Sequence, residues 1–297
     1  MPIMTSAAEF ADFARAHLPQ PFADQWIGLL RPAVVFPLPP AAPQDPALRH
    51  GGDPQLPGDV DWPMLEGYGP MTFVAELDCA ALAAVGGVDL LPESGHLLFF
   101  CADYRYEGAD QDEDWWRRMT PWTQGRVIHV PAGVPRRVRQ TPDDLEPLES
   151  DERLAEVAST PPSLAYEWAE RYFGSAAVEL IERQREATRR GRQDGMTEIY
   201  PLWANDFGLG LHSMRCYVQT GGHSYSVQRP LEIGAARHAL ERRGVIDPSA
   251  DALLDEAEHW RVLLQDVIDD IPVGYWLLRD DDLKARRFDR AYFEIQR

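Results

Sequence analysis

HGGDPQLPGDVDWPMLEGYGPMTFVAELD, residues 50–78, sets the architecture expected for this chain: a loop punctuated by glycine and proline, followed by a short strand. The glycine pair Gly51-Gly52 can adopt positive φ without Cβ strain, and the prolines that follow fix φ at further points. Residues 71–78 then alternate apolar and polar side chains, which is the pattern of a half-buried strand. The sequence therefore predicts an ordered loop that delivers Trp62 to a sheet.

Two interpretations of this stretch stay open. In the structural one, Trp62 is a plug that packs against the sheet. In the functional one, Trp62, Glu76 and Asp78 form the wall of a binding site. The structural interpretation is favoured, because two carboxylates at alternate positions of one strand are common in proteins without such a site.

The composition indicates a folded and strongly acidic protein. Apolar residues make up 44% of the 297 residues, which is enough to bury a core and excludes global disorder. The 29 Lys and Arg residues against 48 Asp and Glu residues leave a formal net charge of −19. Such a chain repels the phosphate backbone, so nucleic acid is not expected as a partner, whereas a basic protein is.

Cysteine usage and hydropathy point to the cytoplasm. Cys79, Cys101 and Cys216 are far apart, odd in number and without a CxxC motif, so no disulfide framework is expected. The first residues contain acidic side chains and lack the apolar core of a signal peptide. No run of eighteen apolar residues occurs, so no membrane partner is expected either.

Periodicity and punctuation predict a mixture of helices and strands. Ser6 and Glu9 have the spacing of a capping box, and Gly244 ends a later helical pattern. The expected helices are 6–18, 80–85, 145–158, 163–192, 231–243 and 250–259, and the expected strands are 33–36, 71–78, 96–101, 126–130, 260–265 and 274–278.

The N-terminal and C-terminal parts of the chain contain similar segments in the same order. The glycine pair at 51–52, the strand at 73–78 and the apolar run at 95–100 are answered by glycines at 221–222 and by strands at 262–266 and 274–278. This predicts one domain over 1–297 with duplicated halves, about 20–135 and 196–297, and a helical insertion at 145–195. Glu76 and Gln265 then hold equivalent positions and are expected to face one cleft.

Several ordered motifs together resemble a known family. They are GGDPQLP, DWP, MTFVAELD, LPESGHLLFF, RVIHVP, TGGHSYSVQ, HWRVLLQ and DDLKARRFDRAYFEIQ. The set resembles the bacterial YwqG-like family, also called DUF1963, over about 50–130 and 217–296. The resemblance implies an α+β fold with mainly antiparallel strands in two related repeats packed with helices. It implies no established activity, although members have been suggested to act around toxin and immunity loci. This chain departs from the family pattern at Glu76, where a Gln is usual.

The motifs of common catalytic sites are absent from the sequence. There is no Walker loop, no GxSxG and no HExxH, and none of the eight histidines forms an i, i+4 pair. Neither a metal site nor a cofactor is therefore expected. Cys216 with His212 or His223 is conceivable as a nucleophile with its base, but a buried structural cysteine is the favoured interpretation.

Two functional hypotheses follow. In the first, the protein is a non-enzymatic binding module, an immunity or regulatory factor that occupies a basic partner, with Trp115 and Trp116 as anchors. In the second, it is an enzyme or small-ligand binder whose cleft lies between the repeats. The residues expected to line that cleft are Trp62, Glu76, Asp78, His223 and Gln265. The first is favoured because no reaction can be named for the second, and the sequence leaves the oligomeric state open.

Overall fold

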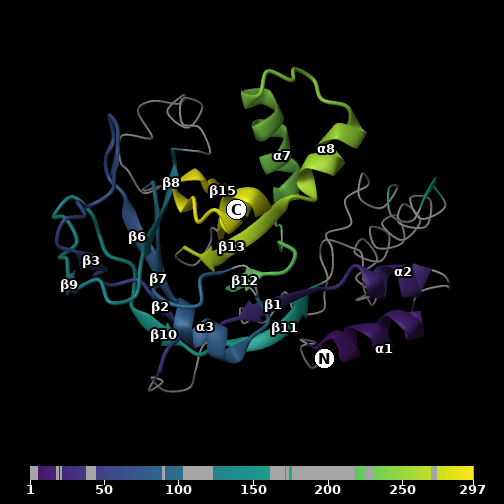
Figure 1. Cartoon of the computed structure of the whole chain (residues 1–297), viewed down its shortest axis with the longest axis horizontal. Helices are drawn as coiled ribbons and strands as arrows, with labels where there is room; N and C mark the ends of the chain where they lie inside the picture. Colours follow the sequence, from purple (N-terminus) through teal and green to yellow (C-terminus); the bar gives the residue numbers. More distant parts are fainter. Residues whose placement is uncertain are drawn as a thin grey trace, which may run out of the picture.

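Two antiparallel β-sheets that share one hydrophobic core organise the chain (Figure 1). The architecture comes from a computed structural model, which describes residues 6–17, 20, 22–37, 45–88, 91–102, 123–160, 171, 174–175, 218–224, 226, 230–268 and 273–296.

The first sheet has six strands in the order β11-β1-β12-β13-β14-β15. Every pairing in it is antiparallel. Its strands are β1 (Arg31–Val35), β11 (Glu156–Thr160), β12 (Gln219–Gly221), β13 (Trp260–Val267), β14 (Val273–Arg279) and β15 (Tyr292–Gln296).

The second sheet has five strands in the order β10-β2-β6-β7-β8, and its pairings are also antiparallel. Its strands are β2 (Leu48–His50), β6 (Thr72–Asp78), β7 (His96–Cys101), β8 (Gly125–Val130) and β10 (Asp151–Arg153). Two small ladders stand beside it, one of β3 (Gln55–Pro57) with β9 (Arg136–Val138) and one of β4 (Met64–Leu65) with β5 (Gly69–Pro70).

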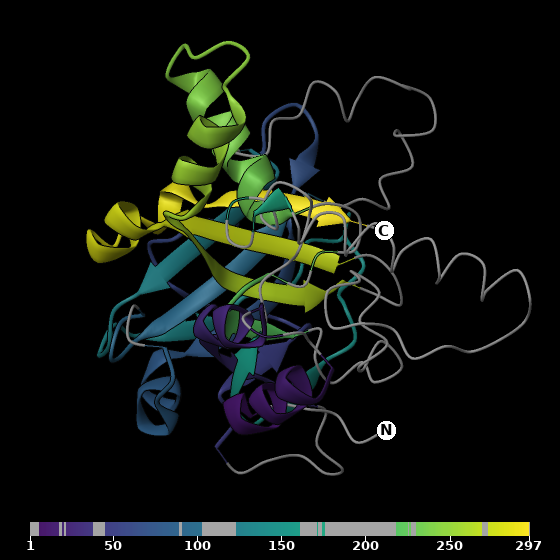
Figure 2. The ribbon, with the colours of Figure 1, turned by 90° about the vertical axis from the view of Figure 1, so that its right-hand side faces the viewer.

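The helices pack around these sheets. They are α1 (Ala7–His17), α2 (Phe22–Gly28), α3 (Cys79–Val85), α7 (Leu231–Arg242), α8 (Ala250–Ala257), α9 (Asp280–Lys284) and the 3-10 turn η3 (Phe288–Arg290). The capping box predicted for the first helix is confirmed, because Oε2 of Glu9 accepts from the backbone and hydroxyl of Ser6. The α7–α8 hairpin projects beyond the sheets, away from α1 and α2 (Figure 2).

Side chains from both sheets interlock between their inner faces. Trp276 of β14 lies edge-on to Phe99 of β7, with ring centroids 5.5 Å apart, and its Nε1 donates to the carbonyl of Phe100 at 3.3 Å. On the other face of the six-stranded sheet, α7 and α8 bury Tyr275 and Leu277. On the other face of the five-stranded sheet, the loop after β2 buries a separate cluster that includes Phe100. The molecule is therefore layered around two sheets, as expected of an α+β protein.

Both glycine pairs are required by close approach as well as by backbone conformation. Gly51 and Gly52 have φ of 61° and 67°, and a Cβ at Gly51 would collide with the carbonyl oxygen of Glu149. Gly222 has φ of 70°, and a Cβ there would collide with the hydroxyl of Thr160. Residues 148–150 therefore pack against the first glycine pair, and Thr160 packs against Gly222 of the second pair.

The sheets also share a detail of strand geometry. Register shifts occur between Phe73 and Ala75 in β6 and between Val262 and Leu264 in β13, just before Glu76 and Gln265 respectively. A β-bulge at that point turns the residues that follow to the opposite face. These are parallels between two sheets, and the internal duplication itself stays a prediction. β1, from the N-terminal part of the chain, belongs to the same sheet as β12 to β15.

One predicted element is wrong and others are confirmed. The acidic stretch 145–158 was expected to be helical, but it forms β10 and most of β11, because pairing with β2 and β1 overrides its local preference. The helices at 231–243 and 250–259 and the strands at 96–101, 260–265 and 274–278 are confirmed within a few residues. α2 was not predicted, and the helix expected at 163–192 falls almost wholly outside the described residues.

Two further features bear on the sequence predictions. Cys79 and Cys101 are buried, and Cys216 lies outside the described residues. Among the helices that the structure describes, none combines the length and the apolar character needed to cross a membrane.

Candidate functional site

The structure brings three of the predicted site residues, Trp62, Glu76 and Asp78, to one face of the five-stranded sheet. The register places Glu76 opposite Leu98. The side chains of Leu98 and Phe100 belong to the hydrophobic cluster on the outer face of the five-stranded sheet, which we call the outer cluster. Leu77 belongs instead to the core between the sheets. Since side chains alternate along a strand, Glu76 and Asp78 point to the outer face. Trp62 also packs on this face.

Trp62 is held as part of the outer cluster. Its indole Nε1 donates to the carbonyl of Met71 at 2.8 Å, and its ring meets that of Phe100 edge-on at 5.8 Å. Both the polar and the apolar parts of the side chain are thus engaged within the protein. This is the geometry expected from the plug interpretation.

Asp78 has a structural task at the end of β6. One of its carboxylate oxygens accepts hydrogen bonds from the backbone amides of Ala80 and Ala81 at 2.8 and 3.0 Å. This is N-capping, which satisfies amides left unpaired at the start of a helix. Asp78 therefore starts α3.

Glu76 is the centre of a buried ion-pair network. Its Oε2 accepts from Arg49 at 2.6 Å, and its Oε1 accepts from Arg136 at 2.7 Å. Arg136 also donates to Nε2 of His96 at 2.8 Å. A guanidinium can only donate, so Nε2 is the acceptor and the proton of a neutral imidazole is on Nδ1, which lies 3.1 Å from Oε1. The side chain of Glu76 is only 7% exposed, so these partners replace its water shell.

The network fixes the charge of Glu76. Burial by itself raises the pKa of a carboxyl group, but the polar contact with His96, the hydrogen bond from Arg136 and the charges of Arg49 and Arg136 outweigh burial and lower the pKa of Glu76 to about 2. The group stays ionised throughout the physiological range. It is therefore poorly suited to deliver or take up a proton near neutral pH.

Gln265 faces away from Glu76, contrary to the shared cleft expected from the sequence. It pairs with Tyr275, which lies in the cluster beneath α7 and α8, whereas its neighbours Leu264 and Asp266 occupy the inner side. Glu76 lies on the outer face of one sheet and Gln265 on the outer face of the other, with the whole core between them. The two residues do not face one cleft, because the register shift in each strand leaves each residue pointing outward from its own sheet.

His223 is also committed to the fold. Its Nε2 lies 2.7 Å from the carbonyl oxygen of Leu29, so it donates there. Burial, and to a lesser extent the charge of Arg31, lower the pKa of His223 to about 3. The ring is neutral at physiological pH and ties the chain after β12 to the end of α2. Trp115 and Trp116 lie outside the described residues.

Sequence reasoning missed a charged cluster between the sheets. Nδ1 of His50 lies 2.9 Å from Oδ2 of Asp266, with the histidine side chain 9% exposed and the aspartate fully buried. Arg153 forms two hydrogen bonds of 2.7 Å with Asp151 in β10, next to β2. Burial lowers the pKa of His50, but the charge and hydrogen bond of Asp266 and the charge of Asp151 raise it above its ordinary value of 6.5. The only sequence signal was that His50 precedes the first glycine pair.

The contact between His50 and Asp266 joins the two sheets, although these residues are 216 positions apart in the sequence. Oδ1 of Asp266 has no hydrogen-bond partner among the residues that the structure describes. An ionised carboxylate at this depth is costly unless a charge compensates it, which makes the histidine its natural counter-ion. In the described part of the chain, no group of three or more His, Cys, Asp or Glu side chains is placed to hold a metal ion.

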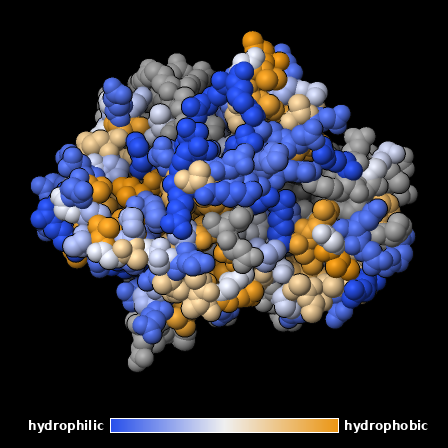
Figure 3. Space-filling model, in the orientation of Figure 1, coloured by the Kyte–Doolittle hydropathy of each residue, from blue (hydrophilic) through white to orange (hydrophobic). Residues whose placement is uncertain are grey.

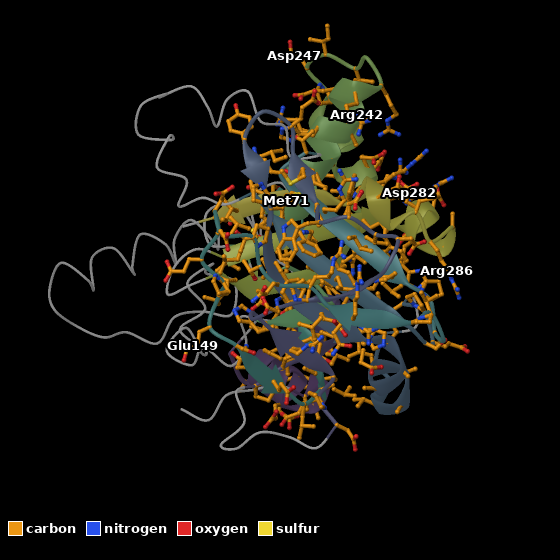
Figure 4. The ribbon with its side chains drawn as sticks, turned by 90° about the vertical axis from the view of Figure 1, so that its left-hand side faces the viewer. Met71, Glu149, Arg242, Asp247, Asp282 and Arg286 are labelled. Atoms are coloured by element: carbon orange, nitrogen blue, oxygen red, sulfur yellow. The ribbon has the colours of Figure 1, made fainter. Side chains whose placement is uncertain are left out.

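A further charged feature is the segment 141–160, which carries exposed carboxylates. It crosses Gly51 and Gly52, then forms the last strand of the five-stranded sheet and continues directly into the last strand of the six-stranded sheet. Figure 4 shows Glu149 at the periphery of the sheets. Five exposed carboxylates lie on this segment: Asp143, Asp144, Glu146, Glu149 and Glu156. Its single basic residue, Arg153, is buried and paired.

Apolar residues are not gathered into one large surface on the face seen in Figure 3, where small hydrophobic patches are scattered among hydrophilic ones. We call residues 141–160 the acidic edge segment. Two apolar residues within it are exposed: Leu154 is 47% exposed and Val157 is 53% exposed.

Comparison with known proteins gives one result. A family model described as Domain of unknown function (DUF1963) matches residues 49–296. The match spans the middle of the chain as well as the two regions that carry the motif resemblance. A search of curated proteins finds no match.

Proposed function

The chain belongs to the DUF1963 family, and on that premise we propose that it is a non-enzymatic binding module for a positively charged protein. In this proposal it acts in the cytoplasm as an immunity or regulatory factor that occupies its partner. The observation that carries the proposal is the acidic edge segment, where four exposed carboxylates lie in the loop before β10 and a fifth, Glu156, lies on β11.

Electrostatics explains why such a segment suits binding. A net charge of −19 produces a long-range negative potential around the molecule. A partner of opposite charge is attracted and oriented before contact, which accelerates association and disfavours acidic competitors. Exposed Leu154 and Val157 add apolar contact area in the middle of the same segment.

The alternative, an enzyme or small-ligand binder with a cleft between the repeats, has less support. Glu76 and Gln265 point away from each other, and each lies on the far side of its own sheet from the shared core. Trp62, Asp78 and His223 have hydrogen-bond partners within the fold. Glu76, one of the two carboxylates expected in that cleft, is held ionised by two arginines.

The test is affinity capture from bacterial lysate with the full chain as bait, elution by a salt gradient and identification by mass spectrometry. A variant with three neutralised carboxylates in the acidic edge segment is compared with a control that loses the same charge elsewhere. The variant is Asp143→Asn, Asp144→Asn and Glu149→Gln, and the control is Asp251→Asn, Glu241→Gln and Asp289→Asn, all at exposed positions.

We expect one stoichiometric basic protein that elutes with salt, is lost from the variant and is retained by the control. Equal capture by the variant and the control would contradict the assignment of the acidic edge segment. A neutral or acidic partner that elutes independently of salt would contradict the proposed function as a whole.

A further inference from the structure

β11 is the last strand of its sheet in the described part of the chain. It pairs with β1 on one side, and the order of the sheet places no strand on its other side. β10, three residues earlier, has the same position in the other sheet. An uncovered strand edge presents backbone donors and acceptors that can pair with another extended chain.

The directions of the backbone groups in β11 follow from its partner. The amide of Phe36 donates to the carbonyl of Val218, which continues the pairing of β1 with β12. Because successive residues of a strand direct their backbone groups to opposite sides, the odd-numbered residues of β1 face β11. Those residues are opposite Glu156, Ala158 and Thr160. The N–H and C=O groups of Val157 and Ser159 therefore point away from β1, toward the side of β11 on which no described strand pairs.

The side chains on this edge combine apolar and acidic groups. A charged side chain such as that of Glu156 disfavours unselective pairing at an edge. Here Val157 is 53% exposed, Leu154 is 47% exposed, and Glu156 between them is exposed. The carboxylates disfavour a second copy of this chain, because pairing of two such edges would bring like charges together. They favour an extended segment that carries lysine or arginine.

We propose that the outer edge of β11 binds an extended, positively charged segment of the partner protein by strand addition. This inference rests on the proposed function and names the surface and the mode of recognition. The backbone groups of Val157 and Ser159 pair with the added strand, as in other cases of β-augmentation. Val157 and Leu154 supply apolar contacts, and the carboxylates of Glu149 and Glu156 select for cationic side chains.

The test measures binding of a fluorescent peptide of alternating lysine and valine, about eight residues long to match a typical strand, by fluorescence anisotropy. In the protein, Ser159→Pro removes the outward N–H and leaves the bonds to β1 intact, since proline is tolerated on an edge with its nitrogen facing outward. Ser159→Ala is the matched control, because it removes the hydroxyl and keeps the N–H.

A second probe changes only the peptide. Methylation of alternate backbone nitrogens keeps its charge and removes the donors needed for pairing. This probe keeps the test valid if Ser159→Pro impairs folding, which circular dichroism would detect. We expect Ser159→Pro to weaken binding about fivefold, because one hydrogen bond is lost, and the methylated peptide to weaken it about tenfold or more, because several hydrogen bonds are lost. Ser159→Ala should change Kd less than about twofold, because its backbone donor is retained.

The possible outcomes distinguish failure of strand addition from failure of the proposed function. If the peptide binds with salt dependence but Ser159→Pro and methylation have no effect, strand addition is overturned and the proposed function stands. If no peptide binds although a basic protein is captured from lysate, strand addition is likewise overturned. If no basic protein is captured either, both proposals fall.

Discussion

Replacing Glu76 by glutamine tests whether the buried network on the outer face of the five-stranded sheet stabilises the fold. The substitution keeps the shape of the side chain and removes the charge that Arg49 and Arg136 contact at 2.6 and 2.7 Å. Both arginines are partly exposed, at 23% and 15%, so water can solvate them after the change. We therefore expect a folded but less stable protein.

The magnitude follows from the pKa of Glu76. Lowering the pKa of a carboxyl group from 4.5 to about 2 on folding corresponds to roughly 3 kcal/mol of stability at neutral pH. Glu76 is only 6% exposed, so solvent screens this contribution weakly. Breaking a buried ion pair by removing one partner costs a similar amount, about 3–5 kcal/mol. Solvation of the two arginines should place the result near the lower end.

The sign of the pH dependence is fixed by the direction of the shift. A carboxyl group whose pKa is lowered on folding contributes its full stability above pH 4.5 and loses it as the pH falls towards 2. The free energy of unfolding of the wild type and of Glu76→Gln, measured by urea denaturation at several pH values, should differ by about 3 kcal/mol at pH 7 and converge as the solution is acidified.

The comparison needs a control that loses a carboxylate without losing a network. Glu93→Gln serves this purpose, because Glu93 is exposed just before β7. Its free energy of unfolding should remain within about 0.5 kcal/mol of the wild type. A difference for Glu76→Gln that is near zero at pH 7, or that does not change between pH 5 and pH 2, would refute the reasoning about the network.

Three further predictions test other parts of the structure. Gly51→Ala should lower the free energy of unfolding by more than about 2 kcal/mol, because a Cβ would collide with a carbonyl, whereas Gly67→Ala, at φ 80° in open space, should cost only about 1 kcal/mol; equal costs in urea denaturation would contradict the close approach. Asp78→Ala should cost about 1 kcal/mol through loss of the N-cap, measured by thermal unfolding. Asp266→Asn should lower the pKa of His50 in an NMR titration; the stability from this pair is full below pH 6.5 and is lost as the pH rises through the raised pKa, so an unchanged titration would exclude the ion pair.

Local patterns in the sequence were sufficient for much of the fold. Alternation predicted β6, apolar runs predicted β7, β13 and β14, and helical spacing predicted α7 and α8. The glycine pair at 51–52 indicated positive φ, which the structure has. These features depend on the conformational preferences and burial of neighbouring residues, so a single sequence carries them.

The candidate site could be predicted only in part. Trp62, Glu76 and Asp78 were identified, and they do share one face. The partners of Glu76 were not, because Arg49 and Arg136 are 27 and 60 residues away in the chain. The direction of Gln265 was missed because one bulged residue reverses the face of every position after it.

The sequence by itself therefore determined the family resemblance, the acidic character and most of the individual strands and helices, since each is a property of composition or of a short window. Only the tertiary structure decided that 145–160 forms two edge strands and that His50 meets Asp266 between the sheets. The physical reason is that strand register and sheet packing depend on contacts between distant segments, and these override the preferences of any one segment.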